Sequence, residues 1–352
     1  MQSSTSPDQP LVSILTPVYN GADFLGECIE SVLAQTYQNL EYIIVNNCST
    51  DRSLEIALNY AKKDKRLRVH SNEAFVGVIE NHNVAFRLIS PEAKYCKVVC
   101  ADDFLFPDYL GRTIEIAEAN PRVGVIGSYQ LSGAYIKWQG FDYPRAVIPG
   151  RELCRRIFLG GDPTFGFGTP TSLTYRADLV RKTTKFYPNP SPHADTSACF
   201  KCLTESDFGF VHQVLSYERI HDGTQTSASV RLDRYSSAYL NDLRQYGPSY
   251  LDQAELDRLI RQALRRYYNF LAVEYILGFR KKDFWNYHQE RFAELGYSLS
   301  RMVLLKSAAS HLGRELLNPV RAMEKLAKRL PRSEKRCHLA QVVSRGKSGS
   351  PT

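Results

Sequence analysis

Apolar residues in the first 130 positions fall into short runs that alternate with amphipathic stretches. The runs have the length and composition of buried strands and lie at 11–15, 42–45, 67–69, 97–100 and 123–126. Between them, apolar positions recur at helical spacing over 24–33, 52–62, 76–88 and 109–119. Strands separated by helices of this length predict an α/β fold, with a Rossmann-like, mostly parallel sheet and helices on both faces.

The pattern changes in the second half of the chain. A Gly- and Pro-rich stretch predicts a loop at 160–170, followed by a strand at 172–175, a helix at 195–204 and strand pieces at 207–220. Beyond about residue 231 the chain resembles a set of helices with many aromatic and basic side chains. We therefore expect one domain over 11–230, made of the halves 11–130 and 131–230, followed by a helical region over 231–343. The two ends, 1–10 and 344–352, are expected to be disordered.

The positive charge of the chain is concentrated at its C-terminal end. The net charge is +8, and the segment from 301 to 352 alone contains twelve Lys and Arg against three Glu. The nearly neutral remainder argues against a broad nucleic-acid-binding surface, so no nucleic-acid partner is expected. Within the basic segment, residues 318–330 form an amphipathic pattern that would rest on anionic lipid as a peripheral membrane contact or pack on the domain at 11–230.

Membrane and disulfide signals are weak. No apolar run approaches the roughly 18–20 residues that cross a bilayer, and the N-terminus lacks the features of a secretory signal. The eight cysteines of a chain this long do not indicate a disulfide framework. Cys199 and Cys202 have the spacing of a metal-binding pair, but no second pair follows at zinc-site spacing. We expect a cytoplasmic protein.

Two adjacent carboxylates, Asp102 and Asp103, follow the strand predicted at 97–100. Such a pair has three common uses: it holds a divalent cation, acts as an acid–base pair, or forms a solvated turn. Asn46 and Asn47 lie at the end of another predicted strand. Because ligands bind outside the carboxyl ends of strands in doubly wound sheets, these positions favour a binding site.

Five motifs follow one another along the chain: LVSILTPVYN at 11–20, SVLAQT at 31–36, VNNCSTD at 45–51, a Gly followed by NHN at 77–83, and ADD followed by PD at 101–108. In this order and spacing they resemble family 2 glycosyltransferases with the GT-A fold. The resemblance is strong over 11–130 and weaker over 165–225. It implies that 11–130 is the nucleotide-sugar-binding half and that 131–230 is the acceptor half.

The resemblance implies the following donor-site residues. Thr16, Pro17 and Tyr19 match the loop that lies against the nucleotide base. Asn47 matches a position that is usually Asp and hydrogen-bonds the base. Its amide oxygen can accept from a uracil or thymine N–H, which favours a UDP or dTDP sugar. Asn83 matches a helix face under the donor site, where contact with the donor and a packing role are alternatives.

Catalytic and metal roles are implied in the same way. Asp102 matches a residue near the ribose and Asp103 the direct ligand of Mg²⁺ or Mn²⁺, although Cys100 stands where the family often has a further Asp. Asp195 matches the general base at the start of a helix. His221, in an Arg-x-His signature, would complete the metal site or touch the diphosphate. The rival candidates for the base are Glu205 and Asp207.

The expected activity is therefore inverting transfer of a sugar from a nucleoside-diphosphate sugar to a glycan or lipid-linked glycan, in cell-surface polysaccharide synthesis. Two alternatives stay open. The departures at Asn46, Asn47 and Cys100 suit a catalytically inactive sugar-nucleotide- or glycan-binding protein. A sugar-nucleotide nucleotidyltransferase would share the sheet, cation and nucleotide, but its first loop should be Gly-rich and basic. Here the loop after the first strand, TPVYNG, has no Lys or Arg.

Overall fold

The computed structural model describes residues 9–139, 141–160, 166–188, 193–221, 234–278 and 282–316. The chain divides into two compact units, the first ending at Arg261 and the second beginning at Gln262. The amphipathic pattern at 318–330 and the expected disordered tail at 344–352 lie outside the described residues, as do residues 1–8 of the expected disordered N-terminus. Residues 9 and 10 are described, and the Asn39 amide donates to the Gln9 carbonyl at 2.7 Å.

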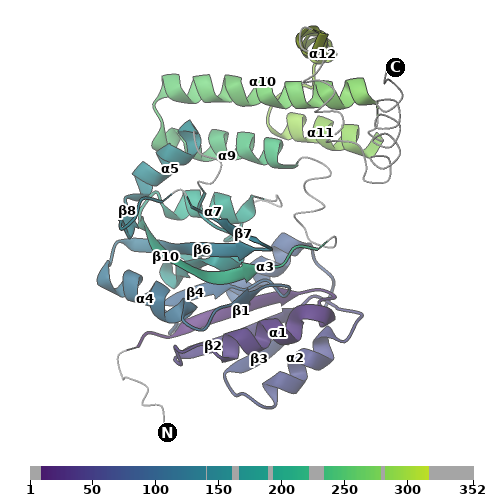
Figure 1. The fold of residues 1–352 in the computed structure, drawn as a ribbon. Coiled ribbons are helices and arrows are strands. Elements are labelled where there is room, and N and C mark those ends of the chain that lie inside the picture. The colour runs from purple at the N-terminus through teal and green to yellow at the C-terminus, as the bar shows by residue number, and fades with distance from the viewer. Residues whose placement is uncertain are drawn as a thin grey trace, which may run out of the picture. The chain divides into compact units, whose positions relative to one another are not determined.

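The first unit is built on one sheet with the strand order β3-β2-β1-β4-β9-β6-β10-β5 (Figure 1). In that order the strands span Leu67–Ser71, Leu40–Asn46, Val12–Val18, Tyr95–Val98, Leu173–Arg176, Val123–Ser132, Asp207–Glu218 and Phe104–Leu105. The pairs β1–β2, β2–β3, β1–β4 and β6–β10 are parallel, whereas β9 runs antiparallel to both β4 and β6. The predicted mostly parallel sheet is confirmed, with β9 inserted in the reverse direction. Short strands β7 (Tyr135–Lys137) and β8 (Val147–Ile148) pair with β6 and β10.

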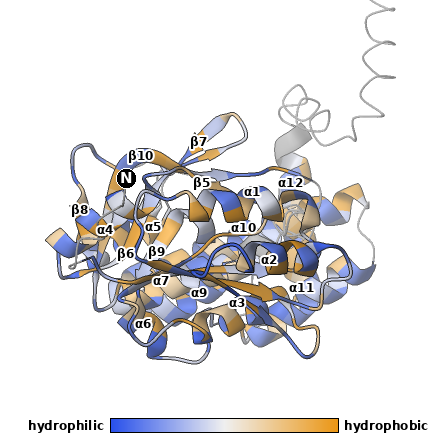
Figure 2. Ribbon diagram, turned by 90° about the horizontal axis from the view of Figure 1, so that it is seen from below, coloured by the Kyte–Doolittle hydropathy of each residue, from blue (hydrophilic) through white to orange (hydrophobic). Residues whose placement is uncertain are grey.

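Helices cover the sheet because each presents an apolar stripe to it. On one face, buried residues of α1, α2 and α4 share a core with β1, β2 and β6; these helices span Ala22–Leu33, Ser53–Ala61 and Tyr109–Ala119. On the other face lie α3, α6 and α7, spanning Val78–Arg87, Ala177–Arg181 and Ala194–Cys202. Figure 2 shows the strands as largely apolar, whereas the helices alternate apolar and polar residues. Buried strands between half-buried helices are what the α/β pattern predicts.

The first compact unit extends beyond residue 230, where we expected the helical region to begin. Helix α9 (Arg234–Tyr250) packs against α7 and α5 (Gly150–Leu159), so it belongs to the first unit. The N-terminal turns of α10 (Gln253–Leu277) are joined to α5 by an ion pair, with 2.7 Å between the Arg155 guanidinium and the Glu255 carboxylate. The helical character that the sequence predicts is confirmed, but part of it completes the α/β unit.

The second unit is helical and contains the rest of α10, α11 (Lys282–Glu294) and α12 (Arg301–Leu316). Its centre is aromatic: the Tyr267 ring packs against His288 and Phe292, and His288 is fully buried. Among the described residues of the whole chain, no helix has both the length and the apolar composition needed to span a membrane. The cysteines that the structure describes are all free thiols.

Candidate active site

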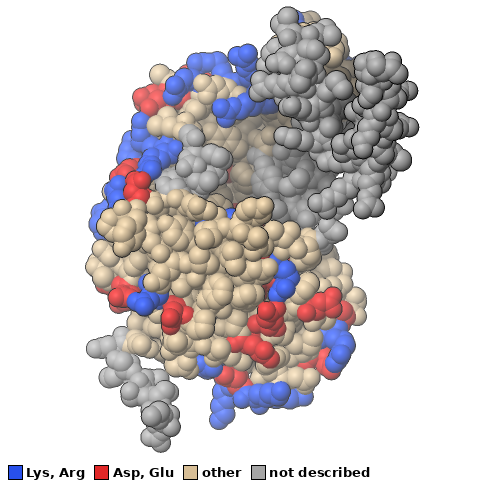
Figure 3. Space-filling view, viewed as in Figure 1, with Lys and Arg blue, Asp and Glu red and all other residues tan. Residues whose placement is uncertain are grey.

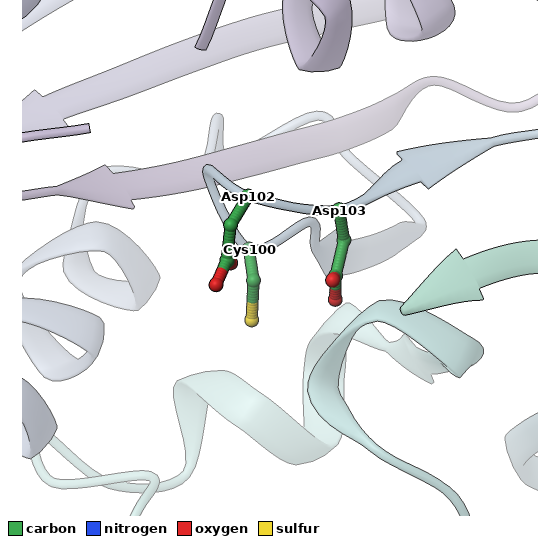
Figure 4. Close-up of side chains that lie close together, drawn as sticks. All are labelled: Cys100, Asp102 and Asp103. Carbon is green, nitrogen blue, oxygen red and sulfur yellow. The ribbon is translucent and has the colours of Figure 1, made fainter. Parts of the chain in front are cut away.

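Three potential metal ligands meet in the turn that follows β4. The thiol of Cys100 and one carboxylate oxygen each of Asp102 and Asp103 lie within 4.8 Å of one another. Figure 4 shows the three side chains pointing to the same side of the turn, with Cys100 between the two carboxylates. The turn joins the parallel strand β4 to β5, so the pair lies at the carboxyl edge of the sheet, as the sequence predicts.

Asp103 is held rigidly and is shielded from water. Asp103 has only 5% of its surface exposed to solvent. Oδ2 accepts a hydrogen bond of 2.6 Å from the Thr171 hydroxyl, and Oδ1 accepts one of 3.0 Å from the backbone N–H of Arg219. Burial, and secondly the charge of Asp102, raise the pKa of Asp103 above its usual range. Each carboxylate oxygen keeps a second lone pair that can bind a cation. A bound cation would also offset the cost of burying the negative charge of Asp103 beside Asp102.

Asp102 is more accessible and pairs with His221. Nε2 of His221 and Oδ2 of Asp102 are 3.1 Å apart, and the His221 ring packs 5.1 Å from that of Phe24 in α1. Arg219 donates from Nε to the Asp102 carbonyl at 3.0 Å and forms an ion pair with Glu27. The Arg-x-His signature after β10 therefore closes around the turn that carries the carboxylates.

A buried cation, Lys97, supports this turn from within the sheet. Lys97 is completely buried in β4, and its ammonium donates to the Thr171 carbonyl at 2.6 Å. The same ammonium lies 3.8 Å from the centroid of the Tyr109 ring. Burial lowers the pKa of Lys97 well below its usual range. Thr171 thus connects the lysine to the Asp103 carboxylate, since its carbonyl accepts from one and its hydroxyl donates to the other.

Asp195 lies in the first turn of α7, where we expected a helix to begin. Its Oδ1 accepts a hydrogen bond of 2.7 Å from the backbone N–H of Thr196. Burial raises the pKa of Asp195 to about 6, and the nearby His193 opposes that shift. Nδ1 of His193 is 3.4 Å from a carboxylate oxygen of the buried Asp242, which also accepts from the Ser197 hydroxyl. A carboxyl poised near neutrality suits proton transfer.

The rival bases are engaged elsewhere. Glu205 is exposed and forms an ion pair with Lys182. Asp207 begins β10, where it pairs with Arg122 at 2.9 Å and accepts from the backbone N–H of Gly150 at 3.2 Å. His221 follows the other end of β10, so Asp207 lies at the sheet edge opposite the acidic pair. Both rival carboxylates are therefore held by other partners.

The loop expected against the nucleotide base is divided between the core and the surface. Thr16 is fully buried, and its hydroxyl bonds to the Val99 carbonyl at 3.0 Å and the Tyr42 hydroxyl at 2.9 Å. Pro17 is also buried. Tyr19, in contrast, is 49% exposed, and its ring meets the exposed Phe75 ring edge to face at 4.8 Å between centroids. Within this loop, Tyr19 is the side chain best placed to contact a ligand.

Asn47 and Asn83 use their amides inside the protein. The Asn47 oxygen accepts from the Val76 N–H and the Asn72 amide, both at 3.0 Å, and its nitrogen donates to the Val76 carbonyl at 2.8 Å. Asn83 makes a similar pair of bonds, at 2.9 and 3.1 Å, to the backbone N–H and carbonyl of Tyr187. Contact of Asn47 with a base would require exchange of these bonds. Asn83 is packed against Tyr187, with both of its amide atoms bonded to that residue.

The sequence comparisons agree with this geometry. The family model described as "Glycosyl transferase family 2" matches residues 13–182. An uncharacterized glycosyltransferase of Rickettsia prowazekii is 37% identical over 245 residues, which cover 67% of this chain and 72% of the relative. The chain belongs to glycosyltransferase family 2. A further relative, an uncharacterized glycosyltransferase of Haemophilus influenzae, is 35% identical over 120 residues, and that match spans only 36% of its length.

Solved structures of similar fold place this family 2 chain in the GT-A class. Residues 1–349 of S. aureus TarS, in complex with UDP-GlcNAc, superpose with a TM-score of 0.58 at 17% identity, and the match covers 83% of this chain and 82% of that TarS chain. A mannosyltransferase of Pyrobaculum calidifontis, in complex with GDP-Man and Mn²⁺, gives a TM-score of 0.52 at 16% identity, with 86% and 87% covered. At these identities the likeness supports the fold, which confirms the GT-A prediction.

Three residues of this family 2 site were missed by the sequence reasoning. A role for Lys97 could have been predicted, because a charged residue inside an apolar strand needs a partner within the protein. Thr171 lies in the stretch 165–225, where the family resemblance is weaker, and nothing in its identity indicated a bond to Asp103. Asp242 lies on α9, 47 positions beyond Asp195 in the printed sequence, and sequence pattern alone does not bring them together.

Proposed function

We propose that the protein transfers a sugar, with inversion, from a nucleoside-diphosphate sugar to a glycan or lipid-linked glycan. The observation that carries this proposal is the carboxyl edge of the sheet, where Asp102 and Asp103 converge in the turn after β4 and His221 closes on them. Paired carboxylates at this position suit the diphosphate of a nucleotide sugar held through a divalent cation. Family membership makes a glycosyl donor the appropriate nucleotide ligand.

Asp103 and Asp102 would hold Mg²⁺ or Mn²⁺, with His221 as a further candidate ligand. Hard oxygen donors fit either ion, whereas the Cys100 thiol does not, since burial raises the pKa of Cys100 and keeps it protonated. When bound, the cation neutralises negative charge that develops on the departing diphosphate. Thr171 and the Arg219 backbone fix Asp103 in one orientation, which limits the rearrangement needed on binding.

Asp195 acts as the general base in this proposal. It accepts the proton of the acceptor hydroxyl as that oxygen bonds to the anomeric carbon, while the bond from that carbon to the diphosphate oxygen breaks. Attack from the face opposite the leaving group gives inversion. A pKa near 6 leaves Asp195 ionised at neutral pH and still basic enough to take the proton. A base of this kind contributes about 10²–10⁴ in rate.

For the donor, we propose UDP or dTDP as the nucleotide, with its base stacked beside Tyr19 and Pro17 buried behind that loop. The solved complexes of the fold neighbours hold UDP-GlcNAc in one and GDP-Man in the other, so the neighbours leave the base open. The exposed Tyr19 supplies an aromatic surface for a base. Thr16, Asn47 and Asn83 then serve as the scaffold behind the donor, and Asp102 lies towards the ribose.

For the cellular setting, we propose a cytoplasmic enzyme of cell-surface polysaccharide synthesis that touches the membrane through its basic C-terminal segment. The excess of Lys and Arg between 301 and 352 supports attraction to anionic lipid. On the face in Figure 3, acidic and basic side chains are interspersed around α1 and α2, which does not suit a nucleic-acid partner. In a flotation assay with anionic liposomes, the full chain should float with the vesicles and a 1–300 truncation should not. If both float equally, the proposed membrane contact is wrong.

The central test is a thermal-shift screen of UDP, dTDP, GDP and ADP with and without Mn²⁺. We expect stabilisation by UDP or dTDP that depends on Mn²⁺, because a ligand that binds only the folded state raises the melting temperature. Slow release of UDP from a UDP-sugar by water would then distinguish an enzyme from an inactive binding protein. Release of pyrophosphate from a nucleoside triphosphate and a sugar phosphate would instead support the nucleotidyltransferase alternative.

A further inference from the structure

Trp138 has an unusual backbone conformation near the carboxyl edge of the sheet. It follows β7, and its φ angle is +68°, a left-handed value that bulky side chains rarely adopt. Such a conformation costs free energy and is maintained only where surrounding contacts impose it, often at ligand-binding positions. The contacts that hold Trp138 are therefore informative about its role.

The indole of Trp138 is fixed from two directions. Its Nε1 donates to the Gln130 amide oxygen at 3.4 Å. A Cβ placed on Gly166 would lie 2.6 Å from Cζ3 of the ring, so the indole packs where any residue larger than glycine would collide with it. Trp138 nevertheless stays partly exposed. A rigid aromatic ring that still reaches the surface is a ready platform for a ligand.

Strands β6 and β10 carry two buried polar groups with unused hydrogen-bonding capacity, and one of them belongs to the residue that bonds the indole. Gln130 in β6 is fully buried, and its oxygen accepts from the Thr169 hydroxyl at 3.0 Å as well as from Trp138. Its Nε2 has no partner among the described residues. Ser216 of β10 lies opposite Gln130 in the strand register, is fully buried, and likewise has no partner for its hydroxyl within the described part of the chain. Unsatisfied buried groups of this kind call for a ligand or a water.

This cluster is connected to the acidic pair by one short turn. Thr169 caps the 3₁₀ helix η1 (Pro170–Ser172) through a reciprocal pair of bonds with Ser172. Thr171, in the same turn, donates to Asp103. The segment Thr169–Ser172 is therefore bonded to Gln130 through Thr169 and to Asp103 through Thr171. In the sequence, Gln130 and Trp138 lie close to residue 131, where the expected acceptor half begins.

We propose that Trp138 is the platform on which a sugar ring of the acceptor stacks, with Gln130 as the residue that positions the indole. The carbon-bound hydrogens of a pyranose ring pack against the exposed part of an aromatic face, and Gln130 fixes the orientation of the indole through its amide oxygen. This inference rests on the proposed function and deepens it. The acceptor that it identifies is a glycan, recognised through its terminal ring.

The chain has two tryptophans, which gives a direct test. In a Trp285→Phe variant of the full chain, Trp138 is the sole source of indole emission. Saturating UDP and Mn²⁺ are added first, and methyl glycosides of glucose, galactose, mannose and N-acetylglucosamine are then titrated. We expect a saturable emission shift with at least one glycoside. Absence of any shift in a protein that binds UDP would overturn the inference, whereas failure to bind UDP would count against the proposed function itself.

Saturation-transfer NMR with the responding glycoside provides the second measurement. Trp138→Ala should weaken glycoside binding at least about tenfold, as expected for loss of a stacking aromatic, and Trp138→Phe should restore part of it. Gly166→Ala should weaken binding as well, because the added methyl displaces the indole. Tyr135→Ala is the matched control, since Tyr135 is 76% exposed in the same hairpin.

Two results would overturn the inference at this stage. One is an equal loss of glycoside binding in Tyr135→Ala and Trp138→Ala, which would place the ring elsewhere on the hairpin. The other is competition in which UDP displaces the glycoside, because that outcome would assign the platform to the donor. The thermal shift produced by UDP in each variant serves as the check that the protein is folded.

Discussion

The buried amides and hydroxyl of this molecule differ from the carboxyl groups of Asp103 and Asp195 in how their polar atoms are satisfied. Thr16, Asn47 and Asn83 are buried and have their hydrogen bonds satisfied by protein atoms. Asp103, in the turn after β4, and Asp195, in the first turn of α7, have carboxyl groups whose pKa values are raised by burial. The first arrangement stabilises the fold, whereas the second costs stability unless a ligand or a proton compensates it.

This difference indicates where the chemistry is located. A satisfied amide contributes rigidity wherever it occurs, so its position near a strand end says little about ligand contact. A desolvated carboxyl is retained against its cost, and such groups cluster at functional sites. We therefore propose scaffold roles for the amides, a ligand role for Asp103 and a proton-transfer role for Asp195. Variants of these residues test the proposal, in order of decreasing expected effect.

Asp195→Asn should produce the largest change. Turnover should fall by about 10²–10⁴, because the amide cannot accept the acceptor proton, while donor binding is retained. The wild type should also lose activity tenfold per unit below about pH 6, since Asp195 is protonated there, and stay level above it. The measurement is the pH profile of transfer, or of UDP-sugar hydrolysis, for both proteins.

Glu205→Gln is the matched control for this experiment. Glu205 was a rival base on sequence grounds and is exposed in an ion pair with Lys182, so its variant should keep the wild-type profile. An Asp195→Asn enzyme with full turnover, or one that keeps the acidic limb of the profile, would remove Asp195 from the role of base.

Asp103→Asn should weaken Mn²⁺-dependent binding of UDP by about 10²–10³, a loss comparable to removing one preorganised group that stabilises charge. Binding without Mn²⁺ should change little. Calorimetric titration of UDP with and without the ion separates the two effects. Asp108→Asn, whose carboxylate accepts from the Thr36 hydroxyl at 3.0 Å on the surface, is the control. Identical titration curves for Asp103→Asn and wild type would contradict a metal role.

Much of the fold could be predicted because it follows from local pattern. The alternation of apolar runs and helical stripes predicted β1, β2, β3 and β4 within a few residues of their observed bounds. The strand-end position of Asp102 and Asp103 followed from the same pattern. Asp51, two positions before the start of α2, accepts from the backbone N–H of Ala22 and from that of Ser53, both at 2.9 Å.

The roles of individual donor-half residues were harder to predict because they depend on contacts distant in sequence. Asn83 meets Tyr187 across 104 positions, and no local pattern in the chain predicts that pairing. A family motif shows which residue types recur at a site, but it does not separate a ligand contact from the scaffold behind it. Burial and the list of internal partners make that distinction here for Asn47 as well.

Asn83→Ala should reduce stability by about 2 kcal/mol, since the buried backbone N–H and carbonyl of Tyr187 each lose a partner. The folded variant should bind UDP nearly as well as wild type. Urea unfolding and UDP titration give the two quantities. Asn59→Ala, at an exposed position of α2, should change stability by no more than about 0.5 kcal/mol. A loss of UDP affinity without destabilisation would make Asn83 a ligand contact and weaken the comparison between the amides and the carboxyl groups.

Lys97→Met should give the smallest effect and the sharpest distinction between fold and function. Loss of the Lys97 Nζ group leaves the Thr171 carbonyl without its donor, so Thr171 holds the Asp103 carboxylate less firmly and Mn²⁺-dependent UDP binding should weaken about tenfold. Stability should stay within about 1 kcal/mol, because removal of a buried ionisable group offsets the lost contacts with Thr171 and the Tyr109 ring. Lys94→Met, which removes only an exposed ion pair with Glu118, should change neither quantity appreciably. If Lys97→Met instead binds UDP like the wild type and loses several kcal/mol of stability, Lys97 is a scaffold residue like Asn47 and Asn83. The orientation of the Asp103 carboxylate would then depend on Thr171 and the Arg219 backbone alone.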